Sequence, residues 1–394
     1  MTTLGDLRRA PNALASHYGR FDVANRLLLT GHSHQAWPDV ALHGQLEAFT
    51  DAAAAVDGKW ERAFAKAERV REGFRALLDD PGGDIALAGS THDLVVRFLS
   101  SMDIRRRPRL VTTDGEFHTL RRQLARLAEE GVEVVRVPAA PVGTLAERLA
   151  AALTGRTAAV LVSAVLFETS RIVPHLGSLA EACERGGVEL LVDAYHALGV
   201  VPMSIHEQGL GSAWITGGGY KYLQLGEGNC FLRLPPHAAS LRPVVTGWFA
   251  EFEDLAAVPS GRVGYARGGD RFAGSTYDPT SHYRAASVLD FFAEQDLTPA
   301  FLRAVSQHQT GLLAALFDAL DAPPELITRD RSAPRGEYGG FLALESPRAG
   351  ELRKELAERG VLTDSRGNFL RFGPAPYLSD EQLEKAIATL GELF

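Results

Sequence analysis

The sequence predicts an α/β protein with a mostly parallel sheet that carries helices on both faces. One observation is that short apolar runs alternate with helical stretches between residues 85 and 219. A second is that the runs at 158–165 and 188–196 are apolar along most of their length, which is typical of strands buried on both sides. Ligands bind beyond the carboxyl ends of the strands in such sheets, so we expect the functional site there.

Each element is predicted from its own pattern. Residues 44–79 are expected to form a long amphipathic helical region, because apolar side chains recur at helical spacing; they are Phe49, Val56, Trp60, Phe64 and Val70. Strands are then expected at 85–89, 109–113, 132–138, 158–165, 188–196 and 213–219. The helices between them are expected from about Thr91, at 120–130, at 145–153 and at 176–187, where two glycines end the last one.

The composition changes after about residue 255, which predicts two domains. We expect residues 1–43 to dock on a small domain, residues 44–255 to form the large domain, and residues 256–394 to form a crossover and the small α+β domain. The segment 259–282 is rich in Gly, Arg, Ser and Tyr and is interpreted as an ordered, functional loop. A long helical stretch is expected to follow it, at roughly 283–320.

Composition narrows the class of protein. The chain has 394 residues, of which 45% are hydrophobic and 23% charged, with a formal net charge of -8 and no basic tract, so no nucleic-acid partner is expected. No apolar run approaches the ~20 residues of a membrane helix, and the first residues lack a secretory signal, so a cytoplasmic protein is expected. Cys183 and Cys230 have no metal or redox spacing, so we expect no metal.

Three short stretches carry the candidate chemistry. Lys221 lies in GGGYKYLQLGEGN, a stretch with glycines on both sides of the lysine. VDAYHA places Asp193 at the end of a buried strand and His196 three residues later, and AGSTHD places Ser90 and Thr91 at the start of a helix. Taken singly, each has an ordinary structural explanation, as a helix cap or as a core histidine.

Together these residues fit pyridoxal phosphate (PLP). That cofactor requires a lysine amine for its covalent attachment and a carboxylate facing its pyridine nitrogen. A helix N-terminus with hydroxyls suits its phosphate, and Phe117 follows the strand 109–113, where it could stack on the ring. Glycines around Lys221 would let the backbone approach the cofactor closely.

DAYHALGVVP followed by YKYLQLGEGNCFL resembles the kynureninase group of the class V, fold type I PLP enzymes. The resemblance extends to GVLTDSRGNFLRFGPAPYLSD and to LLLTGHSHQAWP, and so covers most of the chain. It implies the fold type I architecture: a large domain with a mostly parallel, seven-stranded type of sheet and a small α+β C-terminal domain.

The resemblance also implies roles around the cofactor. Lys221 would form the Schiff base, and Tyr220 would touch the phosphate and act as a general acid. Asp193 would pair with the pyridine nitrogen, and His196 would lie near the phenolic oxygen. The remaining residues implied to hold PLP are Ser90 and Thr91 at the phosphate, Phe117 on the ring, and Trp248, Ser275 and Thr276.

On the substrate side, Arg371 would bind the α-carboxylate, with Arg366 as the alternative. The segment that contains His32 and Ser33 matches the family's Gly-Asn-Ser position, so both are implied to contact the substrate. Ser275 and Thr276 lie in the segment that crosses the dimer interface in this fold, which implies a homodimer with shared active sites.

The sequence departs from the family pattern at several places. Gly31 is followed by His-Ser-His rather than Asn-Ser, and three glycines precede Tyr220 where the family often has bulkier residues. Glu168 and Arg171 are unexpected near a cofactor edge: they are either surface charges or part of an altered substrate pocket. No role follows from the sequence for His34 or His118.

Kynureninase-type hydrolysis of the Cβ–Cγ bond of kynurenine, or of a related γ-keto amino acid, is the expected reaction. An aminotransferase or a β-eliminating C–S lyase of the same family is the alternative, and a PLP-binding regulatory scaffold is the non-enzymatic one. Cys230 is expected in the core, which disfavours a cysteine desulfurase.

Overall fold

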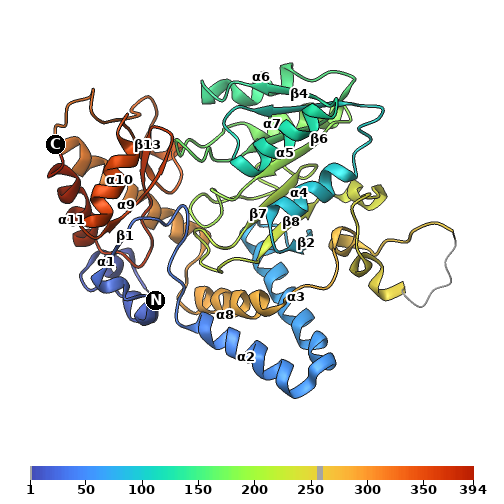
Figure 1. Ribbon diagram of the computed structural model, residues 1–394, viewed down its shortest axis with the longest axis horizontal. Coiled ribbons are helices and arrows are strands. Elements are labelled where there is room, and N and C mark those ends of the chain that lie inside the picture. The colour runs from blue at the N-terminus through green and yellow to red at the C-terminus, as the bar shows by residue number, and fades with distance from the viewer. Residues whose placement is uncertain (1, 255–260) are drawn as a thin grey trace.

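The computed structural model describes residues 2–254 and 261–394 and contains a seven-stranded mixed sheet with a smaller unit beside it (Figure 1). The strands of the large sheet run in the order β2-β8-β7-β6-β5-β3-β4. Strands β3 to β7 pair in parallel, whereas β8 is antiparallel to both of its neighbours. The mostly parallel α/β fold is therefore confirmed. The bounds are β2 (Asp84–Ala88), β3 (Arg109–Thr113), β4 (Glu133–Val137), β5 (Thr157–Ser163), β6 (Glu189–Asp193), β7 (Trp214–Gly218) and β8 (Cys230–Leu234).

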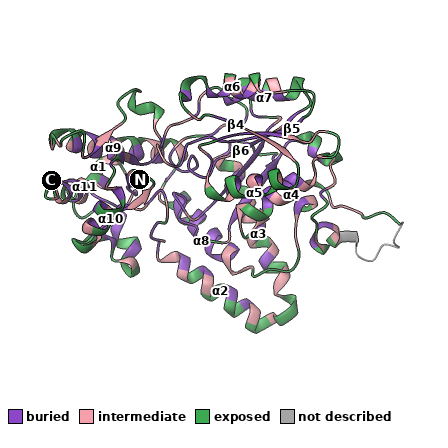
Figure 2. Ribbon diagram, turned by 45° about the horizontal axis from the view of Figure 1, so that its top comes forward, coloured by how far each residue is buried: buried purple, intermediate pink, exposed green. Residues whose placement is uncertain are grey.

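Helices cover both faces of this sheet, as the alternation of side chains along β5 shows. Val160 and Val162 join one hydrophobic cluster, and Ala159 and Leu161 join another on the opposite face. The first cluster receives side chains from α6 (Leu145–Ala151) and α7 (Leu176–Arg185), and the second from α4 (Thr91–Ser100) and α5 (His118–Glu129). All seven residues of β5 are buried, so its apolar run is explained by burial on two sides (Figure 2).

The helical region before β2 differs from its predicted pattern. It consists of α2 (Val40–Ala55) and α3 (Lys59–Leu77), separated at Val56, which has φ 49°. Phe49 and Val56 were expected on the buried face, but they are 76% and 72% exposed. The prediction was wrong here because α2 packs on α8 (Thr280–Glu294) through small residues such as Gly44, not through its largest apolar side chains.

The smaller unit is built on a four-stranded antiparallel sheet in the order β12-β13-β10-β9. Its helices lie beside this sheet, near both ends of the chain (Figure 1). The bounds are β9 (Thr328–Arg329), β10 (Leu342–Glu345), β12 (Asp364–Arg366), β13 (Phe369–Phe372), α9 (Pro299–Ala319), α10 (Ala349–Glu358) and α11 (Asp380–Gly391).

The N-terminal segment contacts this smaller unit. Strand β1 (Leu27–Leu28) pairs in parallel with β11 (Val361–Leu362). Earlier in the chain, after α1 (Leu4–Arg8), the Asn12 amide donates to the carbonyl of Pro376 at 2.9 Å. The division at 43/44 and 255/256 stays a prediction, and the second boundary falls on residues 255–260, which lie outside the described residues.

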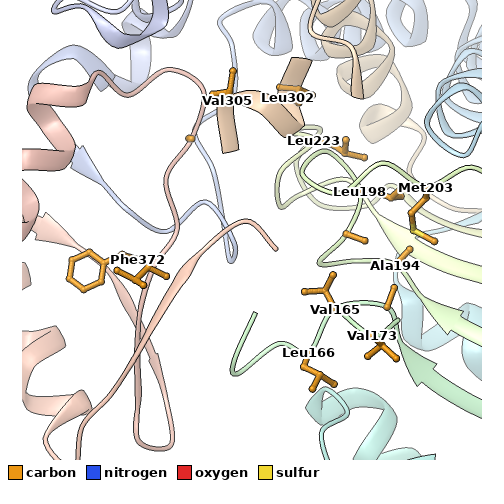
Figure 3. Packing of buried hydrophobic residues seen from close by; sticks show 14 of the residues in the cluster. Val165, Leu166, Val173, Ala194, Leu198, Met203, Leu223, Leu302, Val305 and Phe372 are labelled. Carbon is orange, nitrogen blue, oxygen red and sulfur yellow. The ribbon is translucent and has the colours of Figure 1, made fainter. Parts of the chain in front are cut away.

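Apolar side chains also pack at the carboxyl ends of β5 and β6. Figure 3 shows Val165, Val173 and Ala194 close together, with Leu198 and Met203 beyond them. These residues belong to the first hydrophobic cluster, which fixes the backbone just after Ser163 and Asp193. Among the described residues, no helix is long and apolar enough to cross a lipid bilayer.

Gly44→Ala should destabilise the protein by ~1–3 kcal/mol, the usual cost of overpacking a close contact. A Cβ at residue 44 would lie 2.5 Å from the carbonyl oxygen of Tyr283 on α8, and backbone cannot move away cheaply. Urea unfolding monitored by circular dichroism measures the change. Gly58→Ala is the matched control, because its Cβ would lie 3.7 Å from its nearest neighbour and its φ is -66°. Equal unfolding midpoints for the two variants would contradict the close α2–α8 packing.

Candidate active site

A cavity lies where the carboxyl ends of β5, β6 and β7 meet the N-terminus of α4. Seven of the residues singled out in the sequence line it: Ser90, Thr91, Phe117, Asp193, His196, Tyr220 and Lys221. They come from separate segments of the chain, and the parallel sheet brings them to one edge. The structure thus places these seven predicted cofactor residues around one cavity.

Lys221 lies in a tight turn that follows β7. The N–H of Gly219 donates to the carbonyl of Asn229 at 2.9 Å, and the N–H of Leu225 donates to the carbonyl of Gly219 at 2.9 Å. The amine at the end of the side chain is enclosed: Lys221 is only 5% exposed, and its Nζ lies 2.7 Å from Nε2 of His196. The backbone of the turn therefore fixes where the amine can reach.

The glycines before Tyr220 leave room for neighbouring side chains. A Cβ on Gly217 would lie 3.0 Å from the ring of Phe231, and one on Gly218 would lie 2.7 Å from Sγ of Cys230. A Cβ on Gly219 would lie 2.6 Å from Cβ of Leu225. The sequence suggested that these glycines admit the cofactor, and the structure gives a second reason, which is the packing of the strand and of the turn itself.

The surroundings of the Lys221 amine lower its pKa to near neutral pH. Burial is the largest cause and lowers the pKa of Lys221 to about 7, assisted by the positive charges of Arg371 and Arg366. The carboxylate of Asp193 acts in the opposite direction and raises that pKa. At neutral pH both the free amine and its cation are consequently populated.

Asp193 is the last residue of β6, and His196 lies in the turn that follows it. One oxygen of Asp193 accepts the N–H of Tyr195 at 2.8 Å, and burial raises the pKa of this carboxyl. Burial also holds the pKa of His196 well below its ordinary value, so its imidazole is neutral. Its Nδ1 has no hydrogen-bond partner among the described residues.

Ser90 is both a helix cap and part of the cavity wall. Its hydroxyl accepts the N–H of Asp93 at 3.2 Å, which makes it the N-cap of α4. Thr91 opens the helix beside it, so the positive end of the helix dipole faces the cavity. Cys230 is buried in β8, as expected, yet it also lines the cavity, and burial raises the pKa of its thiol to about 12.

Aromatic rings surround the amine. The Lys221 Nζ lies 4.6 Å from the ring centre of Tyr195 and 5.2 Å from that of Phe117. Tyr195 was missed in the sequence, and its only signal there was its place between Asp193 and His196. Burial raises the pKa of Tyr220 to about 12, so its phenol keeps its proton at neutral pH.

The predicted substrate residues do not line this cavity but form a second cluster next to it. The Arg371 guanidinium donates to the carbonyl of Phe167 and pairs with Asp364, and only its Nε lacks a partner in the described part of the chain. His32 is fully buried, stacks on Phe341 at 4.6 Å and lies 3.8 Å from Asp364.

Ser33, which the resemblance implied to contact the substrate, lies beside the cavity together with two residues that had no assigned role, His34 and Glu227. Ser33 lies 3.2 Å from Nδ1 of His34, and the His34 ring stacks on Tyr220 at 4.8 Å. Nε2 of His34 is 3.7 Å from Glu227, which lines the cavity. Glu227 was missed because an acidic residue in a glycine-rich loop looks like any solvated charge.

Three residues predicted to hold PLP or to cross an interface lie apart from the cavity. Trp248 is 43% exposed, and its Nε1 donates to the hydroxyl of Thr276 at 3.3 Å. Ser275 and Thr276 are also exposed. None of the three lines the cavity within this single chain.

The unexpected polar residues after β5 do not line the cavity. Arg171 pairs with Asp330 at 3.0 Å and Glu337 at 3.3 Å, so it is neither an isolated surface charge nor part of the cavity: it links the large sheet to the smaller unit. Glu168 is partly exposed, and His118 packs its ring against Phe167 at 5.5 Å.

Comparisons with known proteins agree with this geometry. The kynureninase C-terminal domain family matches residues 302–390. An uncharacterised aminotransferase of Bacillus subtilis is 25% identical, with 83% of this chain and 84% of that protein aligned. A kynureninase of Geobacillus thermodenitrificans is also 25% identical, but the alignment covers 63% of this chain and only 57% of that enzyme.

Solved structures share the fold. A cysteine desulfurase from Thermococcus onnurineus superposes with a TM-score of 0.81 at 15% identity and 98% coverage of both chains. A mutant of C-DES with glycine covalently linked to PLP has a TM-score of 0.80 at 18% identity, covering 96% of this chain and 98% of that one. The chain is a class V, PLP-dependent aminotransferase-like protein. As a class V protein it has the fold type I architecture, and the family similarity supports an enzyme.

In the PLP-free protein the Lys221 amine should titrate near pH 7. Competitive acetylation followed by peptide mass spectrometry gives the pH profile of its reactivity, with the exposed Lys354 as the internal reference. Asp193→Asn should move the Lys221 profile to lower pH, because the anion that favours the ammonium ion is removed. A Lys221 profile that rises only above about pH 9, as for an ordinary lysine, would contradict the assigned environment.

Proposed function

We propose that this protein binds PLP at Lys221 and hydrolyses the Cβ–Cγ bond of an amino acid with a γ-keto side chain, kynurenine being one such substrate. The observation that carries the proposal is the buried Lys221 amine, with a pKa of about 7 and its Nζ 2.7 Å from His196. An amine that is partly uncharged at neutral pH can both bond to a carbonyl cofactor and accept a proton from a substrate carbon.

The residues around the cavity fit PLP by their chemistry. Asp193 has one oxygen engaged with the N–H of Tyr195, which leaves the other able to accept from a protonated ring nitrogen. Nδ1 of His196 is a buried polar atom without a described partner. Ser90, Thr91 and the start of α4 suit a phosphate. When bound, PLP supplies an electron sink that stabilises negative charge on the substrate Cα.

The protein's own groups then have separate tasks. Lys221 is the base that takes the Cα proton, since its pKa of about 7 leaves a large share of the amine free at neutral pH. Tyr220 is the acid, since its pKa of about 12 keeps the phenol protonated. In the overall reaction the oxygen of water bonds to Cγ, the Cβ–Cγ bond breaks, and Cβ takes up a proton, which yields alanine and a carboxylic acid.

The similarity to kynureninases supports this reaction. It includes a family match to residues 302–390 as well as the Geobacillus thermodenitrificans kynureninase, which aligns over 63% of this chain. Desulfuration through a nucleophilic cysteine is disfavoured, because Cys183 and Cys230 are both buried and burial raises the pKa of each thiol to about 12. An aminotransferase is the second candidate, since the Bacillus subtilis aminotransferase aligns over more of this chain, 83%.

We also propose a homodimer located in the cytoplasm. Trp248, Ser275 and Thr276 lie away from the cavity of their own chain, which is consistent with segments that reach a partner's site. Large apolar side chains are exposed on α2 and on the segments on either side of residues 255–260: Leu46, Phe49, Val56, Val244, Val245, Trp248, Phe252, Val263 and Tyr277. Such a surface suits burial against a second copy.

The reaction is tested by incubating the PLP-loaded protein with a panel of amino acids and identifying the products by mass spectrometry. Hydrolysis gives equal amounts of alanine and a carboxylic acid from kynurenine or another γ-keto amino acid. A 2-oxo acid without alanine would establish the aminotransferase instead. In Lys221→Ala, borohydride should no longer fix PLP to the peptide that contains residue 221, and product formation should cease. Full activity of Lys221→Ala would show that the site is elsewhere.

Arg371→Ala should raise KM by tenfold or more, or about 1.4 kcal/mol, without changing the affinity for PLP. A substrate carboxylate would take the free Nε–H and replace the Phe167 carbonyl or Asp364 on the fork. Arg371→Lys should show the same rise, because lysine keeps the charge but cannot form two parallel hydrogen bonds. A larger effect in Arg366→Ala than in Arg371→Ala would transfer the role to Arg366.

A further inference from the structure

Glu116 is a buried carboxyl group that no step above uses. It follows β3, directly before Phe117, and is only 2% exposed. Its two oxygens accept three hydrogen bonds: from the hydroxyl of Thr113 at 2.7 Å, from the hydroxyl of Ser163 at 2.6 Å, and from the N–H of Ser163 at 3.2 Å. Glu116 therefore belongs to a buried hydrogen-bond network and is not a solvated surface charge.

The place of Glu116 in the sheet explains these contacts. The paired residues of β3 and β5 end at Val111 and Val160, after a shift in register. The hydroxyl of Thr112 donates to the carbonyl of Leu161 at 3.0 Å, and Glu116 then accepts the N–H of Ser163. Hydrogen bonds made by side chains therefore replace the main-chain hydrogen bonds of the sheet where β3 and β5 separate at the cavity. Without Glu116, the buried N–H of Ser163 would lack its acceptor.

Both neighbours of this carboxyl belong to the candidate cofactor site. Phe117 follows Glu116 in the chain, lines the cavity, and meets Phe167 edge to face at 5.4 Å. Ser163 also lines the cavity and is the register partner of Asp193 in the β5–β6 pair. The N–H of Ala164 donates to the carbonyl of Asp193 at 2.8 Å, so displacing the end of β5 would also displace Asp193.

We infer that Glu116 is a positioning residue for the cofactor: it ties the end of β3 to the end of β5 and so holds the Phe117 ring and the Asp193 carboxyl in fixed relation across one cavity. The inference rests on the proposed PLP site. The carboxyl acts through its hydrogen bonds and not through its charge. Burial and the nearby Asp193 raise its pKa to about 7, so it is partly protonated at neutral pH, while Ser163 and Thr113 act against that rise.

Four variants test this role in the PLP-free protein, titrated with PLP by absorbance and by visible circular dichroism of the bound cofactor. Glu116→Ala should raise the Kd for PLP by about tenfold or more and weaken the circular dichroism per bound PLP, because the ring loses its fixed orientation. Glu116→Gln keeps a carbonyl for the Ser163 N–H and should restore both quantities to nearly wild-type values. Thr113→Val, which has the same shape and lies outside the cavity, should give an intermediate effect.

Glu189→Ala is the matched control. Glu189 lies at the opposite end of β6 and accepts from Nε1 of Trp214 at 2.7 Å, so its removal disturbs the same sheet away from the cavity. It should leave the Kd and the circular dichroism unchanged, and thermal unfolding of every variant verifies folding. If Glu116→Ala does not fold, Thr113→Val and Glu116→Gln still decide the question.

The outcomes separate the two proposals. Suppose that the wild-type protein binds PLP and that Glu116→Ala or Thr113→Val has the same Kd and circular dichroism as the wild type. This result overturns the positioning role alone. A Glu116→Gln variant as impaired as Glu116→Ala also overturns it, because the charge would then be what matters. If the wild-type protein itself does not bind PLP, the proposed function fails.

Discussion

The site depends on one constraint: the protein must enclose the amine of Lys221. Lys221 is 5% exposed, and an ammonium ion in that position loses most of its hydration. Asp193 is the anion that favours the cation, whereas Arg371 and Arg366 oppose it. The balance places the pKa of the amine at about 7. If the side chain turned outward to water, burial would be lost and the pKa would return toward its ordinary value. The surrounding backbone must therefore keep the amine enclosed for it to stay reactive.

The turn that holds the amine is fixed from two distant parts of the chain. Arg284 on α8 donates to the carbonyl of Leu225 at 2.8 Å, and Asn229 donates to the carbonyl of Ser281 at 3.0 Å. From the N-terminal segment, the hydroxyl of Tyr18 donates to Gln224 at 2.5 Å, and Gln224 itself has φ 60°. Folding of the lysine loop is thus coupled to α8 and to the N-terminal segment, and the left-handed residue is held by buried partners.

Much of the architecture follows from the sequence, because strands buried on two faces leave long apolar runs such as the one around Val160. The positions of Asp193 and Lys221 at one edge of the sheet followed as well, since Asp193 ends one parallel strand and Lys221 lies in the turn after the next. The exposure of individual side chains could not be predicted in the same way. Phe49 fits the helical period and is nevertheless exposed, because periodicity does not distinguish a helix face that packs in the core from one that does not. Glu116 was missed because its partner Ser163 is 47 residues away, and only the register of the sheet brings them together.

One departure from the kynureninase pattern lies on the proposed substrate side. Gly31 is followed by two histidines separated by Ser33: His32 packs beside Asp364, the partner of Arg371, and His34 stacks on Tyr220. One short segment therefore lies beside both Asp364, the partner of the arginine proposed for the substrate carboxylate, and the phenol proposed as the acid. The stretches that hold Asp193, His196 and Lys221 resemble the kynureninase group, whereas the segment after Gly31 does not keep that group's Asn-Ser. For the proposed reaction, the segment that differs thus lies beside the groups assigned to the substrate carboxylate and to the proton donor.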